Sequence, residues 1–170
     1  MRVRRQLVEK FTDNPEAWEG KTAKEIRAVA GDDRALFWGV DHSVSIGDNT
    51  MFEQGLATVK WNNRRSDGQP TNSTYEVDGD SFLLRAAEAY LNYAEADIRL
   101  NGTCSEKAKG YMDDVRARAH AAAHLTYSLE DVLDERAREF YCEGYRRTDL
   151  IRFGQYGGNQ ATYVWDGKNG

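Results

Sequence analysis

The sequence predicts a mainly α-helical fold with an irregular segment that contains short β-strands. Three stretches, at residues 81–102, 104–120 and 128–154, place apolar side chains at the spacing of amphipathic helices. Two shorter runs, ALFWGV at residues 35–40 and LATVKW at residues 56–61, are rich in aromatic and β-branched residues, which favour strands.

Length and composition indicate a globular domain. The chain has 170 residues, enough to bury a hydrophobic core, and its 40% apolar and 30% charged residues are ordinary proportions. The net charge of −5 argues against a nucleic-acid partner, because phosphates bind to basic surfaces. We divide the chain into an irregular segment with short strands and helices (1–80), a helical core (81–154) and a loose C-terminal tail (155–170).

The irregular segment begins with two short helical patterns. RRQLVEKF is compatible with a short helix, and KTAKEIRAVA contains apolar residues at helical spacing; the turn signal Asn14-Pro15 separates them. The acidic and basic residues at 32–34 predict a capped turn before the first strand. After the second strand, the polar run NNRRSDGQPTNST predicts an exposed loop.

Residues 81–102 and 104–120 predict a pair of antiparallel helices. The first has apolar residues on two nearly opposite sides, which is typical of a helix packed between neighbours. Asn101-Gly102 ends this helix, and the short connection NGTCS joins it to the second. Such a pair is similar to one tetratricopeptide-type repeat. A polar strip runs along the first helix and comprises Arg85, Glu88, Asn92, Glu95 and Arg99.

The helix that begins after Ser128 combines an apolar face with an unusual density of charge. Ser128 is a suitable N-cap, and Arg136 lies on the apolar face between Leu133 and Phe140. A charge in that position is buried only when it is paired. We therefore predict a structural ion-pair network that ties this helix to the preceding helix pair, with the members Arg136, Glu139, Glu143, Arg146 and Asp149.

The same carboxylates raise the question of catalysis. Two carboxylates four residues apart on a helix have roughly the separation that glycoside hydrolysis requires. However, neighbouring arginines lower a carboxylate pKa, whereas a general acid needs a raised one. We expect no catalytic residue and no enzyme activity. His120 and His124 are four residues apart but lie at a helix end, so we expect neither a metal site nor a cofactor.

Tryptophans are the candidates for ligand binding. Trp38 and Trp61 lie in the strand-and-loop region, where a flat ring could stack on the C–H face of a sugar. The alternative is that they belong to the core. Cys104 and Cys142 are the two cysteines, and the sequence is compatible with one disulfide or with two free thiols.

Several strings together resemble the SusD/RagB family. LDERAREFYCEGYRRTDLIRFG at residues 133–154 matches its signature over more than twenty positions, and SFLLRAAEAYLNYAEADIRLNG, DDVRARAH and ATVKWNN resemble three further segments. The resemblance implies tetratricopeptide-type helix pairs. It also implies that the chain is the C-terminal portion of a surface lipoprotein of the outer membrane. Such a lipoprotein binds an oligosaccharide or similar nutrient and works with a SusC-like TonB-dependent transporter.

Two further expectations concern what the chain lacks and what it binds. The N-terminus MRVRRQLVEKF has no apolar signal region and no lipobox cysteine, which fits a fragment. The family's glycan site comes mostly from N-terminal loops, so the resemblance assigns no binding residue. The alternative function is a helical-repeat scaffold that binds another protein. An exposed aromatic platform at Trp38 or Trp61 would favour glycan binding, whereas a groove along the polar strip would favour the scaffold.

Overall fold

The computed structural model describes residues 1–61, 65, 67–73, 75 and 82–157. Within these ranges it contains six α-helices, one 3₁₀-helix and one sheet of two short strands, as expected for the predicted mainly helical fold. None of these helices is both long and apolar enough to cross a lipid bilayer. The predicted C-terminal tail is described only as far as residue 157.

The N-terminal half consists of short elements connected by loops. It contains α1 (Arg5–Val8), η1 (Pro15–Trp18), α2 (Ala23–Ala30), β1 (Phe37–Trp38) and β2 (Ala57–Thr58). The side chain of Thr22 caps α2 by accepting from the Glu25 amide, and the Glu25 carboxylate accepts from the Thr22 amide in return. Gly31 ends α2 with a φ of 62°, a value that favours glycine.

The strands are shorter than the six-residue runs that predicted them. β1 and β2 are antiparallel, with Phe37 opposite Thr58 and Trp38 opposite Ala57. β1 stops at Gly39, because the Gly39 backbone turns to exchange hydrogen bonds with Gly20 and Lys21 at 2.8 Å each. A Cβ at Gly39 would lie 2.0 Å from the Trp18 carbonyl oxygen, so only glycine fits this crossing.

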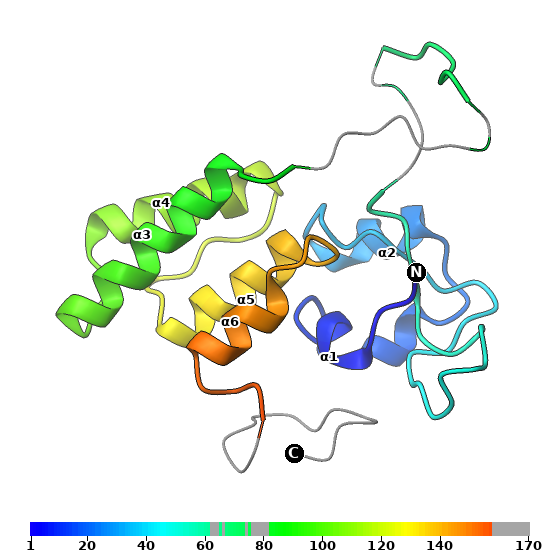
Figure 1. Ribbon diagram of the computed structural model, residues 1–170, viewed down its shortest axis with the longest axis horizontal. Coiled ribbons are helices and arrows are strands. Elements are labelled where there is room, and N and C mark those ends of the chain that lie inside the picture. The colour runs from blue at the N-terminus through cyan, green and yellow to red at the C-terminus, as the bar shows by residue number, and fades with distance from the viewer. Residues whose placement is uncertain (62–64, 66, 74, 76–81, 158–170) are drawn as a thin grey trace.

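The predicted helix pair is formed by α3 (Ala86–Asn101) and α4 (Glu106–Arg118). Gly102 closes α3 with a φ of 73° and donates its N–H to the Ile98 carbonyl. Ser105 caps α4 by accepting from the Ala108 amide at 3.3 Å. The two helices lie side by side in Figure 1.

The prediction that α3 is covered on two opposite sides is wrong for one of them. Leu91, Ala94 and Ile98 are buried against α4 and the next helix. On the other side, Tyr93 is 38% exposed and Leu100 is 85% exposed. The Tyr93 ring contacts the Tyr111 ring of α4 edge-on at 5.0 Å, but the residues of this face stay exposed, because an apolar period shows that a face is apolar and not that it is covered.

The signature stretch forms α5 (Leu129–Phe140) and α6 (Arg146–Arg152). Ser128 and Asp131 form a reciprocal capping box at the start of α5. The expected break lies at Tyr141–Tyr145, where Cys142 and Gly144 have positive φ values of 62° and 86°.

Two hydrophobic cores meet at the end of α5. The α3–α4 hairpin lies on one side of α5 and the N-terminal elements lie on the other (Figure 1). Phe140 is buried in the hairpin core, together with Leu91 and Met112. The next residue, Tyr141, is buried in the N-terminal core, where its ring lies 5.5 Å from that of Phe37.

Candidate functional site

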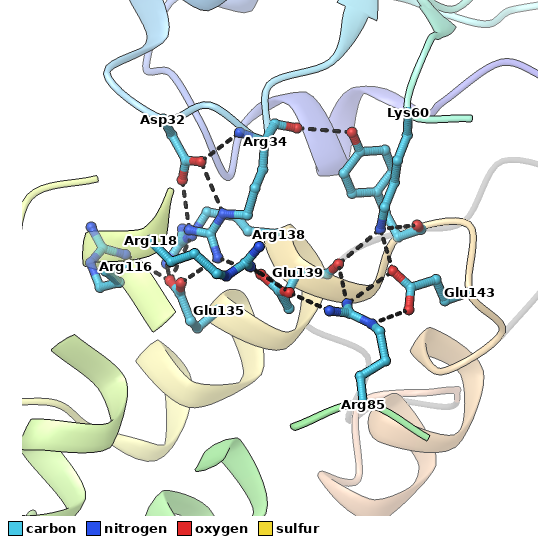
Figure 2. Close-up of polar contacts among 11 residues, drawn as sticks. Asp32, Arg34, Lys60, Arg85, Arg116, Arg118, Glu135, Arg138, Glu139 and Glu143 are labelled. Carbon is cyan, nitrogen blue, oxygen red and sulfur yellow. Dashed lines mark hydrogen bonds and ion pairs between the residues drawn. The ribbon is translucent and has the colours of Figure 1, made fainter. Parts of the chain in front are cut away.

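The charged side chains of α5 form a buried ion-pair cluster between the two cores. Glu135 is fully buried and accepts from three guanidinium groups. Arg34 Nη1 and Arg116 Nη1 each lie 2.7 Å from a Glu135 oxygen, and Arg138 Nη2 lies 2.8 Å away. Arg34 is held in turn by a bidentate contact to Asp32 (Figure 2).

Glu139 and Glu143 extend this cluster toward the surface. Arg85 Nη1 donates to Glu139 at 2.7 Å and Arg85 Nε donates to Glu143 at 2.8 Å. Arg118 donates to both Glu139 oxygens at 2.7 and 2.6 Å. Lys60 Nζ donates to Glu143 at 2.5 Å and to the backbone carbonyl of Glu139, so it closes the C-terminal end of α5 (Figure 2).

Electrostatics keep Glu135 and Glu139 ionised. Burial by itself raises the pKa of Glu135 and of Glu139, but the surrounding arginines outweigh it, so both pKa values are lowered. Burial lowers the pKa of Lys60, and the contact with Glu143 partly offsets this. Glu135 and Glu139 are therefore poor general acids, and each is in contact with arginine. The geometry is that of a structural network.

A second cluster joins α5 and α6 to the polar strip of α3. Arg136 is 3% exposed, and its Nε lies 2.9 Å from Asp149 Oδ1. Arg152 bridges Asp149 and Glu95, and Asn92 accepts from Arg136 Nη1 at 2.8 Å. Both α5 and α6 are thus joined to α3 by charged hydrogen bonds.

The residues predicted for one network are divided between these two clusters. Glu139 and Glu143 belong to the first cluster, and Arg136 and Asp149 belong to the second. Arg146 donates to the Leu133 carbonyl at 3.0 Å, within the α5–α6 unit. Both clusters reach the preceding hairpin, and the first also reaches the N-terminal segment.

Several partners of the first cluster were missed. Arg34 lies 101 residues before Glu135, and Lys60 lies 83 residues before Glu143. The signals available were the Asp32–Arg34 step, interpreted only as a turn, and a lysine next to Trp61. A buried carboxylate requires a cation, but its sequence neighbourhood does not identify which one.

Trp61 forms an exposed aromatic pair at the edge of the first cluster. Its ring is stacked on Phe82, with centroids 6.3 Å apart and an interplanar angle of 30°. Trp61 is 49% exposed and Phe82 is 59% exposed. Beside them lies a cavity of about 310 Å³ that is also lined by Arg85 and Arg118. We call this surface the Trp61 platform.

The other tryptophans lie elsewhere. Trp38 is 38% exposed, but the register places it opposite Ala57, four residues before Trp61. Trp38 is also absent from the residues that line the cavity beside Trp61, so it is not part of the Trp61 platform. Trp18 is buried in the N-terminal core. Trp165 lies outside the described residues.

A groove runs along the polar strip of α3. It has a volume of about 710 Å³, and its walls are α3 on one side and the α5–α6 connection with α6 on the other. Glu88, Asn92, Glu95 and Arg99 of the predicted strip all line it. We call it the α3–α6 groove. Because Phe82 and Glu143 line both this groove and the cavity of the Trp61 platform, the two hollows are adjacent.

No group of three or more metal-ligating side chains occurs among the described residues. His120 contacts Asp33 at 2.8 Å, and the His124 ring stacks on Tyr127. Cys104 and Cys142 are both free thiols, which resolves the alternative left open by the sequence.

Comparison with known proteins gives one consistent result. The model of the SusD family matches residues 5–169. The chain is 40% identical over 160 residues to the starch-binding protein SusD of Bacteroides thetaiotaomicron. The matched region covers 91% of this chain and 28% of that protein. A SusD-like protein of Bacteroides ovatus is 32% identical over 78 residues, which cover 45% of this chain and 14% of that protein.

A solved structure agrees with these sequence matches. Surface glycan-binding protein A from Bacteroides uniformis superposes with a TM-score of 0.51 at 27% identity, over 75% of this chain and 28% of that chain. The names of two of these relatives describe binding, in agreement with the prediction that the chain is not an enzyme. The chain spans 28% of the length of the first relative.

Proposed function

The chain belongs to the SusD family, and from this premise we propose that it forms part of a non-catalytic glycan-binding protein of the cell surface. Its relatives named for starch and surface glycan binding support this proposal. In the complete protein, the ligand is an oligosaccharide or similar nutrient. The complete protein is an outer-membrane lipoprotein that delivers this nutrient to a SusC-like TonB-dependent transporter.

The Trp61 platform is the observation that supports a binding role for this chain. An exposed pair of stacked rings offers a flat apolar surface on which the C–H face of a sugar can pack. Arg85 and Arg118 line the adjoining cavity and can donate hydrogen bonds to sugar hydroxyls. The combination of a ring surface with nearby donors suits a polyhydroxylated ligand.

The ion-pair cluster holds this platform in place. Lys60 precedes Trp61 directly, and its Nζ lies 4.4 Å from the centre of the Tyr141 ring while it donates to the end of α5. The base of the Trp61 side chain is therefore fixed before any ligand arrives. A fixed platform loses less conformational entropy on binding, which favours affinity.

Affinity electrophoresis in gels containing soluble starch, xylan, mannan or pectin tests this function. We expect at least one polysaccharide to retard the chain and Trp61→Ala to weaken that retardation at least tenfold. Trp38→Ala is the matched control, because Trp38 is also partly exposed but does not line the cavity of the platform. Equal retardation of wild type and Trp61→Ala would remove the platform from the proposal. Retardation of a longer protein that contains this chain, but not of the chain itself, would place the glycan site elsewhere.

A second candidate function, a scaffold that binds another protein, is favoured by the α3–α6 groove along the polar strip. If it is correct, no polysaccharide should retard the chain. Peptides selected on the chain from a displayed library should then lose binding when the groove is filled by Ala96→Trp.

A further inference from the structure

The α3–α6 groove contains two buried carboxylates that each lack part of their hydrogen bonding. Glu95 comes from α3 and is 5% exposed, and Asp149 comes from α6 and is 1% exposed. Glu95 Oε2 and Asp149 Oδ2 have no hydrogen-bond partner. Buried carboxylate oxygens are normally satisfied, so an unpartnered one on each wall is an unusual feature of this groove.

The cause lies in how the arginines approach. Asp149 Oδ1 accepts from Arg136 Nε and from Arg152 Nη2, each at 2.9 Å. Glu95 Oε1 accepts from Arg99 Nε at 2.9 Å and also from Arg152. The guanidinium contacts of each carboxylate therefore fall on one oxygen, and the second oxygen of each is left as an acceptor without a donor.

The free oxygen of Glu95 is an anionic acceptor. Burial raises the pKa of Glu95, but the contacts with Arg152 and Arg99 outweigh it and lower the pKa below its usual value. A protonated carboxyl could donate to a neighbour, whereas this carboxylate can only accept. A ligand for the groove must therefore supply donors.

Sugar hydroxyls match these requirements. A hydroxyl donates one hydrogen bond and accepts others, so it can donate to a carboxylate oxygen while it accepts from arginine or asparagine. Asn92 and Thr148 add neutral polar groups to the walls, and Phe82 and Tyr145 add ring surface. We propose that the α3–α6 groove is a sugar-binding subsite in which hydroxyls of an oligosaccharide donate to Glu95 and Asp149.

This subsite rests on the proposed glycan-binding function and extends it. Since Phe82 and Glu143 line both hollows, one oligosaccharide can contact the Trp61 platform and the groove together. A charged peptide fits less well, because the four carboxylates and three arginines of the lining are largely paired with one another and leave little net field.

Access to the free oxygens requires a small rearrangement. Both oxygens are closed to solvent in the unliganded groove. The side chains of Arg99 and Arg152, which pair with the same carboxylates, are 42% and 38% exposed. Long arginine side chains at such exposure change rotamer readily, so a hydroxyl can reach the carboxylates as they shift.

The test fills the groove without removing an ion pair. Ala96 is an exposed residue of α3 that lines the groove, so Ala96→Trp blocks it. Ala117→Trp is the matched control, because Ala117 is an exposed helical alanine of α4 that does not line the groove. Isothermal titration with maltoheptaose, or with the oligosaccharide of whichever polysaccharide retards the chain, measures affinity. We expect at least a tenfold loss in Ala96→Trp and less than a twofold change in Ala117→Trp.

Glu95→Gln tests the acceptor directly, because it replaces a carboxylate oxygen with a donor group. We expect at least a fivefold loss of affinity, with circular dichroism showing that the variant remains folded. Wild-type affinity in Ala96→Trp, together with a loss in Trp61→Ala, would overturn the subsite and leave the proposed function standing. The groove would then remain the candidate site for a protein partner. Failure of every glycan to bind the wild-type chain would overturn the subsite, and failure to bind a longer protein that contains this chain as well would overturn both proposals.

Discussion

Replacing Glu135 with glutamine should destabilise the fold by about 3 to 5 kcal/mol, the usual cost of breaking a buried ion pair from one side. The substitution keeps the size of the side chain and removes its charge. Three guanidinium groups lie within 2.8 Å of Glu135. In the variant they would remain buried between the two cores without the negative charge that pairs with them. Arg34 would keep Asp32, but Arg116 would keep only its bond to the Ala122 carbonyl among the contacts described.

Urea denaturation followed by tryptophan fluorescence and circular dichroism measures this loss. Trp18 is buried in the N-terminal core, and circular dichroism reports on the helices, so the two signals follow both halves of the chain. Glu53→Gln is the control, because Glu53 is exposed and should change stability by less than about 0.5 kcal/mol. A loss below about 1 kcal/mol for Glu135→Gln would refute the idea that this cluster holds the two halves together.

The Glu135→Gln variant should also differ from the wild type in how its stability depends on pH. The pKa of Glu135 is lowered in the folded protein, so its ion pairs stabilise the fold above the unfolded value of about 4.3. That stabilisation is lost as the pH falls through the folded value. Wild-type stability should therefore decrease steeply below about pH 4.5, and the decrease should be shallower in Glu135→Gln. Parallel curves for the two proteins would contradict the assignment.

Three further predictions concern other parts of the chain. Arg136→Ala should cost about 3 kcal/mol or more in urea denaturation because it leaves Asp149 buried and without its Nε contact, and a cost below about 0.5 kcal/mol would show that the pair is unimportant. Ser128→Ala should cost about 1 kcal/mol by removing the capping box of α5, and an unchanged denaturation midpoint would argue against it. Burial raises the pKa of the Cys142 thiol, so iodoacetamide at pH 8 should alkylate it more slowly than a cysteine peptide until urea is added, and equal rates would contradict this.

The helices could be predicted from the sequence because their signals are local. Residues 81–102 and 104–120 contain apolar positions at helical spacing, and Gly102 and Ser105 define the turn between them. The length of the strands was overestimated. Aromatic and β-branched runs indicate extended backbone, but they do not indicate how many residues pair with a neighbouring strand. The close crossing at Gly39, which ends β1, depends on a contact with Trp18 that no local pattern contains.

The site was only half predictable for the same reason. The charge of Glu139 and Glu143 indicated a network, because so many acids on an apolar helix need cations nearby. The identity of Arg34 and Lys60 as partners depends on the tertiary fold, since they are 105 and 83 residues away. The pairing of Trp61 with Phe82 is likewise a contact between residues far apart in the sequence, which composition alone could not reveal.

Phe140 and Tyr141 are neighbours in the chain, yet their rings are buried in different cores. Inserting or deleting one residue in α5 would rotate its side chains by about 100° and remove both rings from their cores at once. Substitutions at exposed positions of α5 should therefore be tolerated far better than any change in its length. The arrangement also couples the two halves during unfolding, because two adjacent residues of one segment are buried in the two cores. The chain should accordingly unfold as one cooperative unit, despite its two separate cores.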